Sequence, residues 1–214
     1  HHGIFDLTYL RMIPNMTIMV PRNGAELRCM IEFSFNYETG PLAIRYPRAN
    51  TAELDENQIP PLEFGKAQIL RKGQNVALFA VGTMVEKAEK VADLLEKHGV
   101  FASVINARFV KPMDEDLIVE LSREAKLVVS LEENTIQGGF GSAMLEILSK
   151  NKICNPTLQI GAPDRFIPQG SLEEQLNEAE LNVAKIYGRV LENLPEVVKK
   201  IRKKRTMEQK KRAS

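Results

Sequence analysis

The residue types best suited to acid–base chemistry at neutral pH lie at the start of the sequence. His1 and His2 lead directly into an amphipathic stretch, and the third histidine of the chain is His98. His98 is predicted to end a helix before Gly99, where a cation interacts favourably with the helix dipole. General acid–base catalysis would therefore fall to His1 or His2, because the ordinary pKa of histidine lies near neutrality. The alternative is that the pair is the remnant of a purification tag.

Two arginines form a second candidate site. Arg45 and Arg48 flank a Tyr-Pro step directly after a predicted strand. Guanidinium groups in this position could bind a phosphate or a carboxylate through paired hydrogen bonds. Alternatively, the two arginines could form ion pairs that anchor the next segment of the chain. The residues alone leave both interpretations open.

Paired carboxylates form a third candidate site. Glu132, Glu133 and Asn134 follow a predicted strand over 127–131 and precede the glycine-rich sequence 138–142. The carboxylates could perform acid–base chemistry, or they could hold a neighbouring subunit or domain in register. The glycines would let the following helix approach the sheet closely.

Two further turns are predicted to be structural. After a strand over 76–81, Gly82 permits a tight turn and Thr83 is expected to cap the next helix. An anion at this helix start is the weaker interpretation, since the turn lacks the GxGxxG pattern. The loop 164–170 contains a Pro and a Gly and is interpreted as a rigid turn.

Strands and helices alternate along the sequence and position these side chains. Strands are predicted at 16–20, 42–46, 67–70, 76–81, 102–106, 127–131 and 157–160, and helices from Asn23 onward and at 85–98, 115–124, 141–150, 172–177 and 182–194. This alternation predicts an α/β fold with an open, mostly parallel, doubly wound sheet. Ligands bind such sheets at the carboxyl ends of the strands, where the polar clusters fall.

The domain organisation follows from the polar segment 49–63, which is predicted to be a linker. Residues 1–48 are too few to cover a parallel sheet and are expected to complete a domain that lies mainly upstream. Residues 64–195 are expected to form a second domain. Residues 196–214 are predicted to be a disordered basic tail, because 199–214 hold nine Lys or Arg residues against one acid, Glu208. An anionic partner is conceivable for this tail, but it has no aromatic residue to stack on a base, so nucleic-acid binding is not expected.

Composition excludes several classes of protein. The 214 residues are 43% hydrophobic and 27% charged, which is typical of a soluble globular protein. No apolar run approaches the roughly 20 residues of a membrane-spanning helix. Cys29 and Cys154 lie far apart without metal-ligand spacing, so we expect free thiols, a reducing compartment and a cytoplasmic location.

Five segments in order resemble the 1-deoxy-D-xylulose-5-phosphate synthases, a family of transketolase-like thiamine diphosphate enzymes. They comprise residues 1–11, 40–48, 108–114, 132–134 with 138–142, and 163–170. The resemblance implies the end of a pyrimidine-binding domain followed by a transketolase C-terminal domain. It also implies a decarboxylative condensation of pyruvate with D-glyceraldehyde 3-phosphate, which supplies precursors of isoprenoids, thiamine and pyridoxal.

The resemblance also assigns roles to individual residues. His1 matches the active-site histidine of the family and Arg48 the arginine that grips the triose phosphate, whereas His2 and Arg45 inherit no role. Ala49 replaces a common glycine. Thiamine diphosphate and Mg²⁺ would belong to a complete, homodimeric enzyme, with their binding groups upstream and no cofactor or metal ligand in this chain.

The isolated chain is therefore expected to be inactive. Two alternatives stay open. The first is another enzyme of the superfamily, such as a transketolase or the β subunit of a 2-oxoacid dehydrogenase. The second is a stand-alone regulatory module that binds nucleotides.

Overall fold

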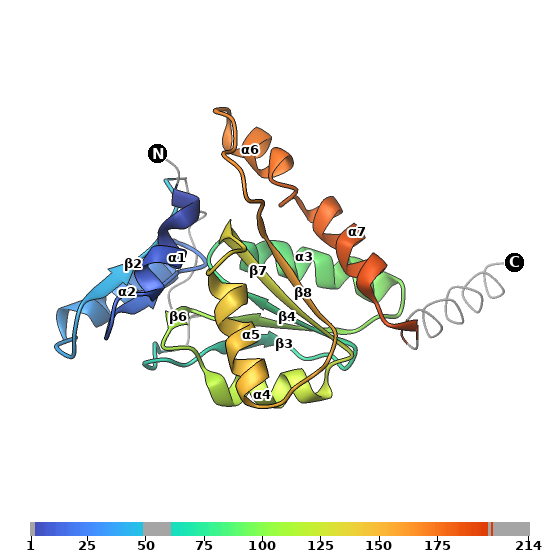
Figure 1. The fold of residues 1–214 in the computed structure, drawn as a ribbon, viewed down its shortest axis with the longest axis horizontal. Helices are drawn as coiled ribbons and strands as arrows, with labels where there is room; N and C mark the ends of the chain where they lie inside the picture. The colour runs from blue at the N-terminus through green and yellow to red at the C-terminus, as the bar shows by residue number, and fades with distance from the viewer. Residues whose placement is uncertain (1–2, 49–60, 197, 199–214) are drawn as a thin grey trace, which may run out of the picture.

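Two sheets organise the chain in a computed structural model, which describes residues 3–48, 61–196 and 198 (Figure 1). The smaller sheet has the order β2-β1-β6 and contains β1 (Thr17–Met19), β2 (Leu42–Ile44) and β6 (Phe109–Lys111). The larger has the order β3-β5-β4-β7-β8 and contains β3 (Gln68–Arg71), β4 (Val76–Ala80), β5 (Ala102–Asn106), β7 (Leu127–Thr135) and β8 (Thr157–Ala162). The larger sheet is parallel except for its edge strand β3, which runs antiparallel to β5.

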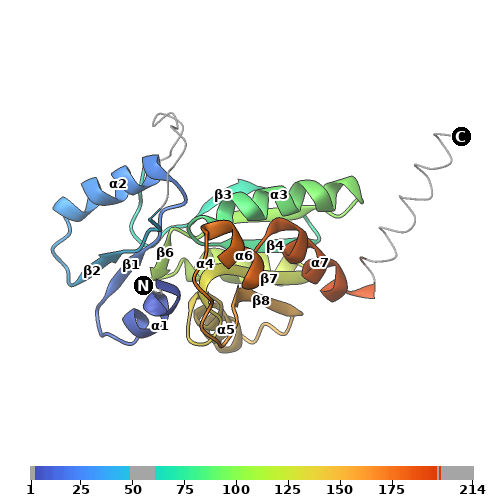
Figure 2. The same cartoon turned by 90° about the horizontal axis from the view of Figure 1, so that it is seen from above.

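Helices lie on both faces of the larger sheet. The helical elements are η1 (Gly3–Phe5), α1 (Asp6–Arg11), α2 (Gly24–Phe35), α3 (Met84–Lys97), α4 (Glu115–Glu124), α5 (Phe140–Lys150), α6 (Leu172–Glu178) and α7 (Val183–Asn193). Seen from above, α3 and α5 lie on opposite sides of the sheet (Figure 2). The doubly wound, mostly parallel fold predicted from the sequence is therefore confirmed.

The central strand β4 explains how both faces are covered. Its residues are all buried, and alternate side chains point to opposite faces. Val76 and Leu78 pack in a cluster with residues of α3 and α7, whereas Ala77 and Phe79 pack in a cluster with residues of α5. The second cluster also contains Leu7, Ile18 and Val20, so the first residues of the chain share a core with the larger sheet.

Most predicted elements are present, and two differences matter for the site. The sequence analysis missed β6, a strand of three residues that ends before Pro112 and pairs antiparallel with β1. Strand β7 continues to Thr135, so Glu132–Asn134 lie within a strand rather than after it. Both differences arise from pairing with distant strands, which extends or creates a strand where local periodicity gives no signal.

Several predictions fall outside the described residues. These include His1, His2, Ala49 with most of the linker, and the basic residues of 199–214. Cys29 and Cys154 form no disulfide, as expected. Among the helices of the described part of the chain, none has the length and apolar character needed to cross a membrane.

Candidate functional site

The candidate site lies where strands of both sheets end. Strands β4 and β7 are parallel neighbours, so their carboxyl ends share one edge of the larger sheet. Arg45, at the end of β2, reaches this edge and places a guanidinium nitrogen 3.1 Å from Oε2 of Glu133. Thr83 donates a hydrogen bond to the other carboxylate oxygen, and Nζ of Lys87 lies 4.0 Å from it. Glu133 therefore joins the two sheets through charge.

The contact with Glu133 corrects the prediction for Thr83. Helix α3 begins at Met84, and the Thr83 side chain forms no capping hydrogen bond with it. The nearby carboxylate binds the hydroxyl instead, because a hydrogen bond to a charged acceptor is stronger than one to a neutral group. Gly82 does adopt the predicted tight turn, with φ of 59°.

Glu132 is fully buried and binds the beginning of α5. Its carboxylate accepts hydrogen bonds from the backbone N–H groups of Phe140 (2.7 Å) and Gly141 (2.8 Å). Burial raises the pKa of Glu132 to about 7, an effect that these hydrogen bonds and the charges of Arg11 and Arg45 oppose. The carboxylate satisfies amide groups that the helix itself leaves unpaired.

The glycines before α5 are required by close packing. A side chain at Gly139 would collide with the carboxylate of Glu132 and would lie 2.7 Å from Nδ2 of Asn134. Gly138 has a φ of 71°, and a Cβ there would lie 2.8 Å from Cγ2 of Thr8. The glycine-rich sequence thus lets this loop approach both β7 and the first helix.

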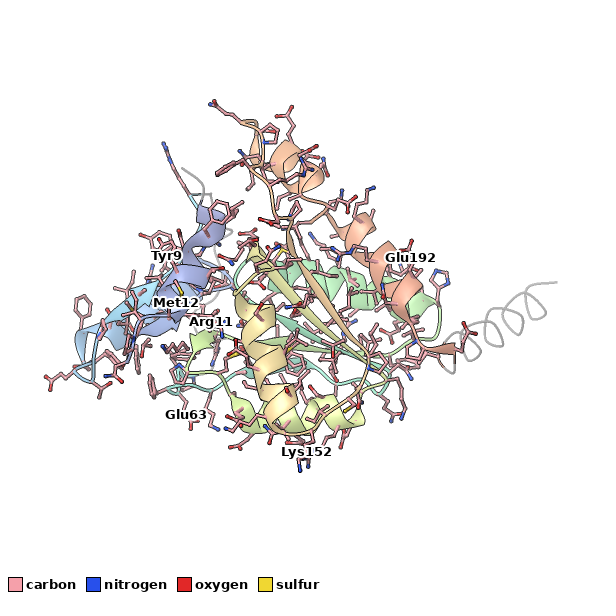
Figure 3. The ribbon with its side chains drawn as sticks, in the orientation of Figure 1. Tyr9, Arg11, Met12, Glu63, Lys152 and Glu192 are labelled. Carbon is pink, nitrogen blue, oxygen red and sulfur yellow. The ribbon has the colours of Figure 1, made fainter. Side chains whose placement is uncertain are left out.

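Asn134 and Arg11 connect α1 to this same loop. Oδ1 of Asn134 accepts a hydrogen bond from the backbone N–H of Leu7 (3.1 Å), and Nδ2 donates one to Oγ1 of Thr8 (2.9 Å). The Arg11 side chain, labelled in Figure 3, donates to the carbonyl oxygens of Gly138 (2.5 Å) and Gly139 (2.9 Å). Helix α1 therefore packs on the end of β7 through directional contacts.

These contacts decide between the two interpretations of the acidic segment. Glu132 is occupied by backbone amides, Glu133 by Arg45 and Thr83, and Asn134 by α1. The arrangement supports a role in holding one domain in register with another. It gives no support to acid–base chemistry, because Glu132 is closed to solvent and Glu133 is paired with cations.

The two arginines of the second candidate site behave differently. Arg45 forms the kind of ion pair that one interpretation predicted. Arg48 is exposed, and no hydrogen bond or ion pair joins it to another described residue. His1 lies outside the described residues, five positions before α1.

Other predicted features are structural. His98 follows the last residue of α3, as predicted, and its ring lies 6.2 Å from that of Tyr187. In the turn 164–170, Arg165 pairs with Glu178 at 2.6 Å. Arg11 was missed by the sequence analysis, because its partner Gly138 is 127 positions away and spacing carries no signal for such a contact.

Comparison with known families matches both parts of the chain. The family described as transketolase, C-terminal domain, matches residues 65–186. The chain belongs to the transketolase C-terminal domain family. The family described as transketolase, pyrimidine binding domain, matches residues 1–53.

Several curated relatives are 1-deoxy-D-xylulose-5-phosphate synthases. The protein from Caldanaerobacter subterraneus subsp. tengcongensis is 42% identical over 92% of this chain, which covers 32% of that relative. The protein from Acaryochloris marina is 45% identical over 89% of this chain, which covers 30% of that relative. The chain thus spans about a third of the length of these relatives.

A solved structure shares the fold of this chain. It is described as a split gene transketolase in the form of an inactive tetramer. It superposes on this chain with a TM-score of 0.81 at 32% sequence identity. The match covers 91% of this chain and 62% of that one. The similarity therefore includes both sheets rather than the larger one alone.

Proposed function

We propose that this chain supplies the last part of the pyrimidine-binding domain and the C-terminal domain of a 1-deoxy-D-xylulose-5-phosphate synthase. The observation that carries the proposal is the 42% and 45% identity to such enzymes over about nine-tenths of the chain. The enzyme would join pyruvate to D-glyceraldehyde 3-phosphate with release of carbon dioxide. It would be a homodimer in the cytoplasm that contributes to isoprenoid, thiamine and pyridoxal precursor synthesis.

Two residues of this chain would act on the substrates. His1 would lie beside the reacting carbon and the substrate hydroxyls, and Arg48 would bind the phosphate of the triose. The exposure of Arg48 supports this role, because its guanidinium remains accessible to an anion. Arg45 would not compete for that anion, since Glu133 already neutralises it.

Thiamine diphosphate and Mg²⁺ would be held elsewhere in the enzyme. The described residues contain no group of three or more His, Cys, Asp or Glu side chains that could hold a metal ion. The described residues therefore do not fit a site for a magnesium-bound diphosphate.

The test compares the isolated chain with the complete enzyme of which it would form part. The complete enzyme is expected to form carbon dioxide and 1-deoxy-D-xylulose 5-phosphate when given both substrates, thiamine diphosphate and Mg²⁺. The isolated 214-residue chain should form neither. Turnover by the isolated chain, or no product from the complete enzyme, would contradict the proposal.

Substitution of Arg48 tests the substrate role. Arg48→Ala in the complete enzyme should raise the KM for triose phosphate roughly tenfold to a hundredfold, because a hydrogen bond to a charged group contributes about 1.5–3 kcal/mol. Arg48→Lys keeps the charge and should recover part of the loss. An unchanged KM in Arg48→Ala would remove this residue from the site.

A transketolase is the second candidate, favoured by the solved structure that shares the fold at 32% identity. The higher identity to the synthases makes it the weaker candidate. A transketolase would use a ketose phosphate as donor and release no carbon dioxide. Measuring carbon dioxide from pyruvate therefore separates the two activities. Nothing in the described geometry favours a stand-alone nucleotide-binding module.

A further inference from the structure

Helix α1 depends on the larger sheet for its structure. It has six residues, and helices this short are marginal in water unless other elements stabilise them. Its N-cap residue, Phe5, offers no side-chain hydrogen bond to the first turn. The backbone N–H of Leu7 instead binds Oδ1 of Asn134, which is 1% exposed. Asn134 thus caps α1 from a strand that is distant in sequence.

The other end of α1 is held in the same way. Nζ of Lys111, on β6, donates to the carbonyl oxygens of Arg11 (2.9 Å) and Ile13 (2.7 Å). A lysine at this position satisfies carbonyl groups that the last turn of a helix leaves unpaired. Residues that follow the linker therefore determine where α1 begins and ends.

Glu133 has a comparable effect on the turn that carries Arg48. The backbone N–H of Arg45 donates to the carbonyl oxygen of Met19 (2.9 Å), which fixes its main chain to β1. Its side chain is only 15% exposed and is fixed by Glu133, itself 12% exposed. Arg48 lies three positions further on, beyond Pro47, whose ring restricts the intervening backbone. The carboxylate of Glu133 therefore orients the beginning of this turn.

Neighbouring residues of β7 thus reach two different parts of the candidate site. Successive side chains of a strand point to opposite faces, so Glu133 and Asn134 diverge from one another. One contacts the segment before Arg48 and the other contacts the helix after His1. These two contacts have no partner in common, so their effects should be separable.

We propose that Glu133 and Asn134 are positioning residues through which the C-terminal domain aligns the substrate site. Glu133 acts through Arg45 on the phosphate-binding turn, and Asn134 acts through α1 on the segment that carries His1. The inference rests on the proposed function. It adds that the C-terminal domain controls substrate affinity and turnover through two adjacent side chains.

The test uses the complete enzyme and separates KM from kcat. Glu133→Gln removes the charge that holds Arg45, and it should raise the KM for triose phosphate about tenfold while kcat changes less than about threefold. Asn134→Ala removes the cap of α1 and should lower kcat about tenfold with a smaller change in KM, because a displacement of about 1 Å can cost up to a hundredfold in rate. Equal changes in both parameters for both variants would overturn the proposal.

Conservative variants and a double variant distinguish a positioning role from a general loss of folded enzyme. Glu133→Asp keeps the charge, and Asn134→Asp keeps the acceptor for Leu7, so each should recover part of its effect. Arg45→Ala and Glu133→Gln should act on KM less than additively when combined, because both break one ion pair. Additive effects, or no recovery in the conservative variants, would overturn the positioning roles.

A control variant distinguishes failure of this inference from failure of the proposed function. Glu115→Gln removes a surface contact with Lys150, remote from the site, and should leave both parameters unchanged. If the parent enzyme forms no product from pyruvate and triose phosphate, the proposed function is wrong. If the parent is active and the Glu133 and Asn134 variants match Glu115→Gln, the positioning roles are wrong.

Discussion

The α3–α7 side of the larger sheet and the junction with residues 3–48 are stabilised in different ways. Behind α3 and α7, a continuous cluster of buried aliphatic side chains includes Leu78, Leu95 and Ile186. At the junction a smaller apolar contact, including Leu7, is surrounded by hydrogen bonds and ion pairs. Apolar packing tolerates changes of shape, whereas hydrogen bonds fix direction. The comparison indicates that the first side supplies stability and the junction supplies alignment.

The largest loss of stability is expected from breaking the buried ion pair of the junction. Nε of Arg108 lies 2.8 Å from Oε1 of Glu26, and the two side chains are 4% and 0% exposed. Arg108→Ala should lower the free energy of unfolding by about 3–5 kcal/mol, because it leaves an uncompensated buried carboxylate. Urea denaturation of the 214-residue chain measures this loss.

A matched double variant shows whether the charge or the shape matters. Combining Arg108→Met with Glu26→Leu replaces the pair by apolar groups of similar length. It should recover much of the stability lost in Arg108→Ala, since apolar replacements of buried pairs are often neutral. A double variant as unstable as Arg108→Ala would show that charge is not what makes this contact essential, and that packing or the hydrogen bonds from Asn106 and the backbone of Arg22 to Glu26 are.

On the apolar side, Leu95→Ala should cost about 2–5 kcal/mol, the usual range for a buried leucine. Leu95 is fully buried between α3 and the sheet. Leu145, on α5, is 39% exposed, and Leu145→Ala serves as the control with a much smaller loss. Urea denaturation of both variants checks the difference. A loss below about 1 kcal/mol for Leu95→Ala would contradict the view that this side supplies stability.

The buried carboxyl of Glu132 predicts a pH dependence of stability at the junction. Burial raises its pKa to about 7, whereas the ordinary value is 4.5. Between these values the folded chain binds more protons than the unfolded chain, so the Glu132 contribution favours folding at low pH and is lost as the pH rises towards 7. This contribution should amount to roughly 2–3 kcal/mol across the window.

Comparison with Glu132→Gln isolates this effect from other titrating groups. The charges that face Glu132 belong to Arg11 and Arg45. The unfolding free energy of the parent minus that of Glu132→Gln should therefore fall between pH 4.5 and pH 7. A difference that is constant with pH would show that the pKa of Glu132 is the same in the folded and unfolded chains.

The sequence predicted the apolar side better than the junction. Buried strands such as β4 and amphipathic helices such as α3 have local periodicity that a sequence reveals directly. The roles of Asn134, Lys111 and Arg11 depend on partners about a hundred or more positions away. The acidic segment was singled out by its residue types, but only the fold decided between chemistry and alignment.

The smallest expected effect is local and concerns the end of α1. Lys111→Met removes the donor to the carbonyl oxygens of Arg11 and Ile13 but keeps an apolar chain of similar length. The free energy of unfolding should fall by only about 0.5–1.5 kcal/mol, typical of exposed hydrogen bonds. Hydrogen exchange should nevertheless accelerate in the amides of α1, while those of β4 stay protected until global unfolding.

Lys150→Met provides the matched control, because Lys150 pairs with Glu115 on the surface of α4 and α5. It should leave exchange in α1 unchanged. Leu95→Ala, by contrast, should accelerate exchange throughout the larger sheet, because the whole apolar cluster opens together. If Lys111→Met accelerated β4 as much as α1, the junction and the apolar side would form one cooperative unit. Selective acceleration of α1 would instead establish that alignment at the junction can be lost while the sheet stays folded.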